Sequence, residues 1–287
     1  MDMLFVAHLL NGILMVGMPI ALAIFLTWRW KNGSKIWWIG AATFVLSQVG
    51  HIPFNQLIGK LLNQTGMVAW DPLAQLLFNA IFLGLSAGIF EEGTRYLVLR
   101  FWARDARSWR NGILFGAGHG GAEAIIFGAL SLYAFLQLAT LRNADLSKVF
   151  PASQLALAQS QVLTYWSTTW YGSLLGALER FFTIPCQIAM AILVMQVFTR
   201  KKIGWLFVAI GYHTLIDASA VIGLRYLAPL ELEGIVGLFA VVSILIIYFL
   251  RQPEPIQPGL IRKDEPFIPP AEPIQESSEN LEKTRYQ

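Results

Sequence analysis

The sequence predicts an all-α, multi-pass transmembrane helix bundle. Hydrophobic residues make up 55% of the chain and charged residues only 14%, and the mean hydropathy is +0.54. Apolar runs of about twenty residues, the length that a helix needs to cross a bilayer, recur along the chain. Basic-rich and basic-poor connections alternate between these runs, which is the pattern expected of a multi-pass protein.

We expect about seven spans. They cover residues 3–28, 36–59, 72–99, 112–141, 171–198, 204–224 and 232–250. Basic clusters follow the first, third and fifth spans, and Arg251 follows the seventh. The positive-inside rule therefore predicts an external N-terminus and a cytoplasmic C-terminus. Tryptophans gather at the predicted span ends, where an interfacial aromatic belt belongs.

The predicted protease-like bundle occupies residues 1–251. Within it, residues 142–170 form a long external connection, which we expect to be an interfacial helix or a lid. Residues 252–287 are rich in proline, glutamate and serine and predict a disordered cytoplasmic tail. The single cysteine, Cys186, excludes an intramolecular disulfide, and a net charge of +3 does not indicate a nucleic-acid partner. The expected partner of the bundle is the lipid bilayer.

Ionisable residues within the spans carry the functional information, because each costs roughly 2.5–3.5 kcal/mol at mid-bilayer. Three spans supply them: Glu91, Glu92 and Arg95 on the third, His119 and Glu123 on the fourth, and His213 and Asp217 on the sixth. At 1.5 Å per residue, the three groups lie roughly 12–15 Å from the cytoplasmic ends of their helices. This shared depth predicts one polar cavity in the cytoplasmic half of the bundle.

The spacing of these residues indicates their roles. Glu91 and Glu92 point about 100° apart on a helix, so they need not share a role. Two carboxylates beside Arg95 would tend to have different pKa values, which suits one as a general base and the other as its orienter. Glu92 continues a stripe that contains Gly84 and Gly88, which predicts a tightly packed neighbour for Glu92. Each His-x-x-x-carboxylate pair puts an imidazole and an acid on one helix face, which suits a divalent metal or an activated water.

Small residues follow one face of the fourth span at every fourth position: Gly112, Gly116, Gly120, Ala124 and Gly128. Such a stripe lets another helix backbone approach closely. We expect the third or sixth span to pack there and to bring the charged groups together.

Two other polar features have two readings each. The Glu179–Arg180 pair of the fifth span is as consistent with a packing ion pair as with a functional one, and its estimated depth lies outside the core site. Ser47, Gln48, His51 and Asn55 form a polar stripe on the second span, which either lines the cavity or only packs.

The ordered motifs EExxR, FxxxHxxxE and HxxxD resemble those of the YhfC family of intramembrane metalloproteases, distant relatives of the PrsW proteases and the type II CAAX prenyl endopeptidases. The matching residues are Glu91, Glu92, Arg95, Phe115, His119, Glu123, His213 and Asp217. The resemblance runs from about the third predicted span to the sixth and leaves out the tail. Each motif is weak alone, but their order and helix placement are moderately specific together.

The resemblance implies hydrolysis of a peptide bond in or beside the membrane, in a membrane-protein or lipopeptide substrate. In the CAAX-type relatives, the first glutamate and the second-motif histidine activate water; here these are Glu91 and His119. His213 and Asp217 would stabilise the oxyanion. This sequence departs from the CAAX-type pattern in two ways, and both favour a closer similarity to the PrsW and YhfC families. Arg95 follows the first glutamate by four residues instead of five, and Asp217 stands where the CAAX type often has asparagine.

We therefore predict an intramembrane endopeptidase of a bacterial plasma membrane. The predicted catalytic residues are Glu91, Glu92, His119 and His213, supported by Arg95, Glu123 and Asp217. Water would be activated either by a metal-free glutamate–histidine pair or by a divalent ion, preferably zinc. The predicted metal ligands are His119, Glu123, His213 and Asp217. The helix-stripe argument favours Glu92 as the base, the resemblance favours Glu91, and both are kept.

Two other functions use the same residues. A proton-coupled transporter or ion pathway could relay protons through the acids and histidines, although no paired broken helices are evident. A non-catalytic scaffold with a degenerate site is a third reading, against which the completeness of the three motifs argues.

Overall fold

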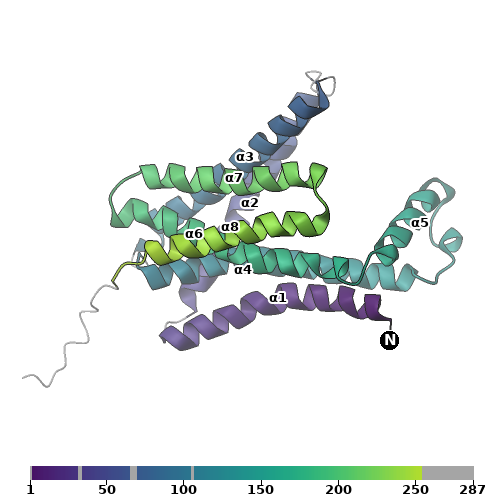
Figure 1. Ribbon diagram of the computed structural model, residues 1–287, viewed down its shortest axis with the longest axis horizontal. Coiled ribbons are helices and arrows are strands. Elements are labelled where there is room, and N and C mark those ends of the chain that lie inside the picture. The colour runs from purple at the N-terminus through teal and green to yellow at the C-terminus, as the bar shows by residue number, and fades with distance from the viewer. Residues whose placement is uncertain (1, 32–33, 65–69, 105–106, 254–287) are drawn as a thin grey trace, which may run out of the picture. The chain divides into compact units, whose positions relative to one another are not determined.

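The structure is a computed structural model that describes residues 2–31, 34–64, 70–104 and 107–253 (Figure 1). Within these ranges the α-helices are α1 (Met3–Trp30), α2 (Lys35–Gln64), α3 (Pro72–Phe101), α4 (Trp109–Leu141), α5 (Ala152–Ser167), α6 (Leu175–Thr199), α7 (Gly204–Tyr226) and α8 (Pro229–Phe249). Two short 3₁₀ helices, η3 (Leu146–Lys148) and η4 (Gly172–Leu174), flank α5. The predicted all-α, multi-pass bundle is confirmed.

Among the described residues, six helical segments are long and apolar enough to cross a membrane: α1, α3, α4, α7, α8 and the segment Gly172–Thr199, which contains η4 and α6. The second predicted span coincides with α2, which is 30 residues long but is not among the six. Polar residues near its middle, including Gln48, His51 and Asn55, lower its mean hydropathy. The count of seven spans is therefore not confirmed, and the orientation of the termini stays a prediction.

Helix α6 is the central element of the bundle. Every residue from Cys186 to Val197 is buried. The helix packs against α4 and α8 and also contacts α1, α3 and α7 (Figure 1). This stretch is apolar apart from Gln187 and Gln196, and neighbouring helices cover it where lipid would cover an outer span.

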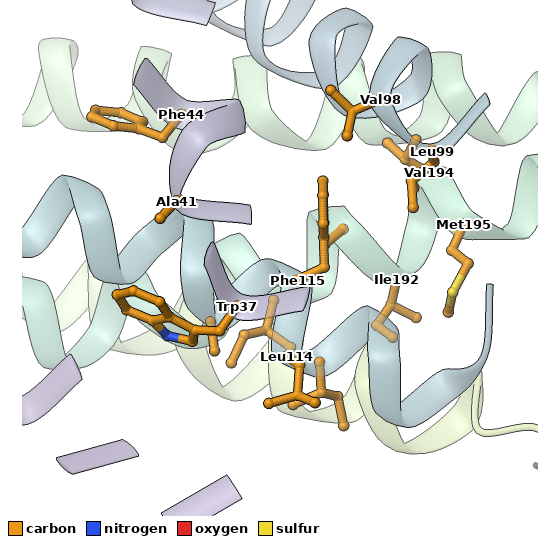
Figure 2. Close-up of a cluster of buried hydrophobic side chains, with 14 of the residues drawn as sticks. Trp37, Ala41, Phe44, Val98, Leu99, Leu114, Phe115, Ile192, Val194 and Met195 are labelled. Carbon is orange, nitrogen blue, oxygen red and sulfur yellow. The ribbon is translucent and has the colours of Figure 1, made fainter. Parts of the chain in front are cut away.

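The largest apolar cluster joins α2, α3, α4 and α6. Figure 2 shows Phe115 of α4 near its middle, with Phe44 of α2 on one side and Val194 of α6 on the other. Phe115 is 1% exposed and Val194 is wholly buried. This cluster holds the helices that carry the polar residues of the next section.

Helices α2 and α4 cross with their backbones in contact. A Cβ atom added to Gly118 would lie 2.0 Å from the carbonyl oxygen of Trp37, and one added to Gly40 would lie 2.0 Å from that of Phe115. Both positions therefore require glycine, because a main-chain atom cannot rotate away from a new side chain.

The glycine stripe of α4 packs against α6, so the expectation of α3 or α7 as its partner was wrong. A Cβ atom at Gly116 would meet Ile188 Cα at 2.6 Å, and one at Gly120 would meet Gln187 Cβ at 2.8 Å. Gly128, further along α4, faces Met15 of α1 instead. The stripe therefore allows α4 to pack closely against α6.

The predicted external connection folds into η3 and α5. Helix α5 is mostly exposed, with Ala158 as its buried residue. It is attached near its end, where Trp166 Nε1 donates to Leu138 O at 3.1 Å and the Tyr165 ring stacks on His8 with centroids 3.9 Å apart. The predicted disordered tail lies, from residue 254 onward, outside the described residues.

We expect Gly118→Ala to lower the free energy of unfolding by about 2 kcal/mol, because the added methyl group would overlap a backbone oxygen. Gly17→Ala is the matched control, since it is also helical and no atom lies within 4 Å of its added Cβ. That change should be neutral or stabilising by up to about 1 kcal/mol. Thermal unfolding of both variants in one detergent tests the difference. Equal midpoints would contradict the close crossing.

Candidate active site

The close contact between α3 and α7 positions Glu92. A Cβ atom added to Gly88 would lie 2.9 Å from Ile210 O, and one added to Gly84 would lie 2.7 Å from Thr214 O. The two helices therefore meet along a glycine face of α3, as the stripe of Gly84, Gly88 and Glu92 predicts. One turn further on, Glu92 Oε1 lies 2.8 Å from His213 Nδ1.

Arg95 is wholly buried at the centre of the cluster. Its Nη1 donates to Glu92 Oε1 at 2.6 Å, and its Nε donates to His119 Nδ1 at 3.4 Å. Its Nη2 donates to Gln187 Oε1 of α6 and lies 3.6 Å from Glu91 Oε2. The guanidinium thus links α3, α4 and α6 through donors in fixed directions.

The arginine also sets the tautomer of His119. Because Arg95 has no lone pair to offer, His119 Nδ1 must be the acceptor of their hydrogen bond. The ring proton of neutral His119 then lies on Nε2, which donates to Glu91 Oε2 at 3.0 Å. The second Glu91 oxygen accepts from Gln48 Nε2 at 3.1 Å. Glu91 is therefore held by two donors, one on α4 and one on α2.

His213 lies between two carboxylates. Its Nδ1 contacts Glu92, whereas its Nε2 lies 3.5 Å from Asp217 Oδ2, one helical turn away. The Asp217 side chain is 37% exposed, compared with 8% for Glu91 and 0% for Glu92. The cluster thus opens on the Asp217 side and is closed around Glu92.

Glu123 does not share a site with His119, although the two residues lie one turn apart on α4. Glu123 Oε1 accepts from Arg180 Nη1 at 2.6 Å, and Glu123 Oε2 accepts from Gln187 Nε2 at 2.8 Å. Arg180 also pairs with Glu179. The Glu179–Arg180 pair therefore holds Glu123 in a second polar group, and Gln187 connects this group to Arg95.

Gln187 was not among the predicted site residues. It is one of two glutamines in the apolar run of α6 and belongs to no motif. A polar side chain in a membrane helix needs a hydrogen-bond partner, and that need was a usable signal. Gln48 of the α2 stripe was recognised with two readings, and the structure brings it into contact with Glu91.

Comparison with known proteins supplies the family. The sequence model described as YhfC intramembrane metalloprotease matches residues 14–245. The chain belongs to the YhfC intramembrane metalloprotease family. The uncharacterized membrane protein YhfC of Bacillus subtilis (strain 168) is 31% identical to it over 253 residues, which cover 82% of this chain and 92% of the relative. No solved structure matches the chain significantly. These findings support an integral multi-pass membrane protein with a bacterial relative.

The description of the YhfC family implies a metal ion, which a zinc site would hold with three or four ligands at about 2.0–2.3 Å. The predicted ligands are His119, Glu123, His213 and Asp217. In the described part of the chain, no three His, Cys, Asp or Glu side chains are arranged to hold one ion. His119 faces Glu91, whereas Glu123 faces Arg180, so the predicted ligands do not converge. As arranged here, these residues do not fit a metal.

We expect Arg95→Met to lower the free energy of unfolding by about 3–5 kcal/mol, because Glu92 would remain buried without its counter-charge. Arg100→Met is the matched control, since Arg100 lies exposed near the end of the same helix. That substitution should change the stability by less than about 0.5 kcal/mol. Chemical unfolding in detergent provides the measurement. A similar loss in both variants would show that the buried guanidinium is not what holds the cluster.

Proposed function

We propose that this YhfC-family chain is an intramembrane endopeptidase in which Glu91 activates water for attack on a peptide bond in or beside the membrane. One observation carries the proposal: the two glutamates of the EExxR motif have different partners. Arg95 pairs with Glu92 at 2.6 Å but lies 3.6 Å from Glu91. The Glu91 carboxylate is oriented by His119 and Gln48 instead. Its remaining lone pairs are available to accept a proton from water.

This division supports Glu91, not Glu92, as the base. Glu92 is wholly buried and shares one oxygen between Arg95 and His213. Its role would be to hold the guanidinium and the imidazole in place. Glu91 retains some exposure and can meet a water molecule. The resemblance-based assignment of Glu91 is thereby favoured over the stripe-based assignment of Glu92.

In the proposed reaction, Glu91 takes a proton from water as the water oxygen attacks the carbonyl carbon. Glu91 then returns that proton to the nitrogen of the leaving amine when the C–N bond breaks. His119, with its tautomer set by Arg95, holds the carboxylate still. The predicted metal ligands do not converge on one point, so the activation of water is assigned to Glu91.

His213 supports the charge that develops on the carbonyl oxygen. Its Nδ1 is anchored on Glu92, whereas the 3.5 Å separation of its Nε2 from Asp217 exceeds an ordinary hydrogen bond. Because Nδ1 donates to the Glu92 carboxylate, Nε2 also carries a proton only when His213 is the doubly protonated imidazolium. In that form Nε2 donates to an oxyanion placed beside it, a contribution that is typically worth about 10²–10³ in rate. The proposed substrate is a membrane protein or a lipopeptide, which would reach the site from the bilayer.

We expect Glu91→Gln to lower kcat by about 10³-fold, because the amide keeps the shape of the side chain but cannot take a proton. The measurement is cleavage of membrane-protein and lipopeptide substrates by purified protein in liposomes. Glu179→Gln is the control and should cleave at nearly the rate of the unsubstituted chain. Full activity in Glu91→Gln would contradict the assignment of Glu91 as the general base. Proton flux without any cleavage by the unsubstituted chain would support the transporter reading instead.

Cleavage should survive a zinc chelator, because the activation of water is assigned to a carboxylate. Metal content and activity are measured before and after chelation. If activity disappears and returns with added zinc, and His119→Ala protein contains less metal, a metal mechanism replaces this one.

A further inference from the structure

Helix α2 carries a chain of hydrogen-bonded side chains that ends on Glu91. Asn55 Nδ2 lies 2.9 Å from His51 Nε2, and His51 Nδ1 lies 3.2 Å from Gln48 Oε1. Gln48 Nε2 donates to Glu91 Oε1 at 3.1 Å. The residues are three or four positions apart, so they share one face of the helix. In the proposed reaction, Gln48 orients Glu91, whereas His51 and Asn55 have no role.

The hydrogen bonds of this chain all run in one direction. An ionised Glu91 needs a donor, so the amide nitrogen of Gln48 faces it and the amide oxygen faces His51. His51 therefore donates through Nδ1, and its Nε2 accepts from Asn55. At the far end, Asn55 Oδ1 is buried and has no hydrogen-bond partner among the described residues.

That end of the chain lies at a cleft between α2 and α3. The cleft has a volume of about 240 Å³ and is lined in part by the amide side chains of Asn55, Asn63, Gln75 and Asn79. Its volume is below the range of about 300–1,000 Å³ that is typical of small-molecule sites. A polar cleft of this size has room for several water molecules, and the unpaired Asn55 oxygen offers them an acceptor.

The middle of the chain, at His51, lies near the open side of the site. His51 is half-buried and lies close enough to Glu91, His213 and Asp217 to interact with them electrostatically. The Phe90 ring stacks on His51 with centroids 5.6 Å apart and holds the imidazole beside α3. The polar face of α2 therefore spans the distance between the amide-lined cleft and the proposed base.

We propose that the α2–α3 cleft is the entrance through which water reaches Glu91, and that His51 is a positioning residue that keeps Gln48 directed at the carboxylate. This inference rests on the proposed function, because hydrolysis consumes one water molecule for each bond that is cut. It also gives a reason for the polar composition of α2, since a route for water needs hydrogen-bonding groups that a lipid-facing helix would lack.

Thiol labelling tests the entrance without any need for activity. Asn55→Cys and Asn79→Cys line the cleft, whereas Ile52→Cys and Ile81→Cys replace exposed apolar residues on the same two helices. Opened membranes are treated with a charged, water-soluble thiol reagent. The thiolate is the reactive species and forms only in contact with water. The unsubstituted chain is the blank, because its single cysteine, Cys186, is buried.

We expect the two cleft cysteines to react at least tenfold faster than the two isoleucine replacements. Equal rates would overturn the proposal, because the cleft would then be no wetter than the apolar surface. This readout does not depend on cleavage. If the unsubstituted chain cleaves nothing, the proposed function fails while the labelling result still decides the entrance.

A second variant tests His51 itself. His51→Phe keeps an aromatic ring against Phe90 but removes both ring nitrogens. We expect kcat to fall at least tenfold with KM unchanged, because Gln48 loses its partner whereas the substrate does not contact position 51. An unchanged kcat would overturn the positioning role. A change in KM alone would overturn it as well, because it would assign position 51 to substrate binding.

Discussion

The buried guanidinium of Arg95 is the interaction on which the site depends. It donates to Glu92 on its own helix, to His119 on α4 and to Gln187 on α6. Because the guanidinium is planar and its donors point in fixed directions, these contacts constrain the rotation of three helices at once. An ammonium group on a flexible stem would carry the same charge without this constraint. Through Gln187 the constraint extends to Glu123 and the second polar group.

Features that depend on one helix at a time were predictable from the sequence. The uniform rise of a helix converts residue counts into depth, so Glu92, His119 and His213 could be assigned to one level. The structure brings these side chains into one cluster. The stripe of Gly84, Gly88 and Glu92 likewise predicted a close neighbour, which is α7. Both inferences follow from helix geometry and need no knowledge of which helices are adjacent.

Features that depend on the choice of partner helix were not predictable. The spacing of His119 and Glu123 places them on one stripe of α4. It does not reveal that Glu123 forms an ion pair with Arg180 of α6 and not with the partners of His119 on α3. The same limitation explains the glycine stripe, whose close approach was expected but whose partner was assigned wrongly. Composition alone also counted α2 with the other spans, although its polar residues contact Glu91 and line a cleft. Interhelical pairing is a tertiary property, and a single sequence contains little direct information about it.

The burial of α6 from Cys186 to Val197 has a consequence for the biogenesis of the protein. Its neighbours come from both sides of it in the chain, and α8 is the last of them to be synthesised. Cys186 and Met190 form one cluster with Ile216 of α7 and Ala240 of α8. A nascent chain that ends before α8 therefore leaves one side of its central helix facing lipid or chaperone. Closure of the interior is then a late event that follows insertion of the final helix.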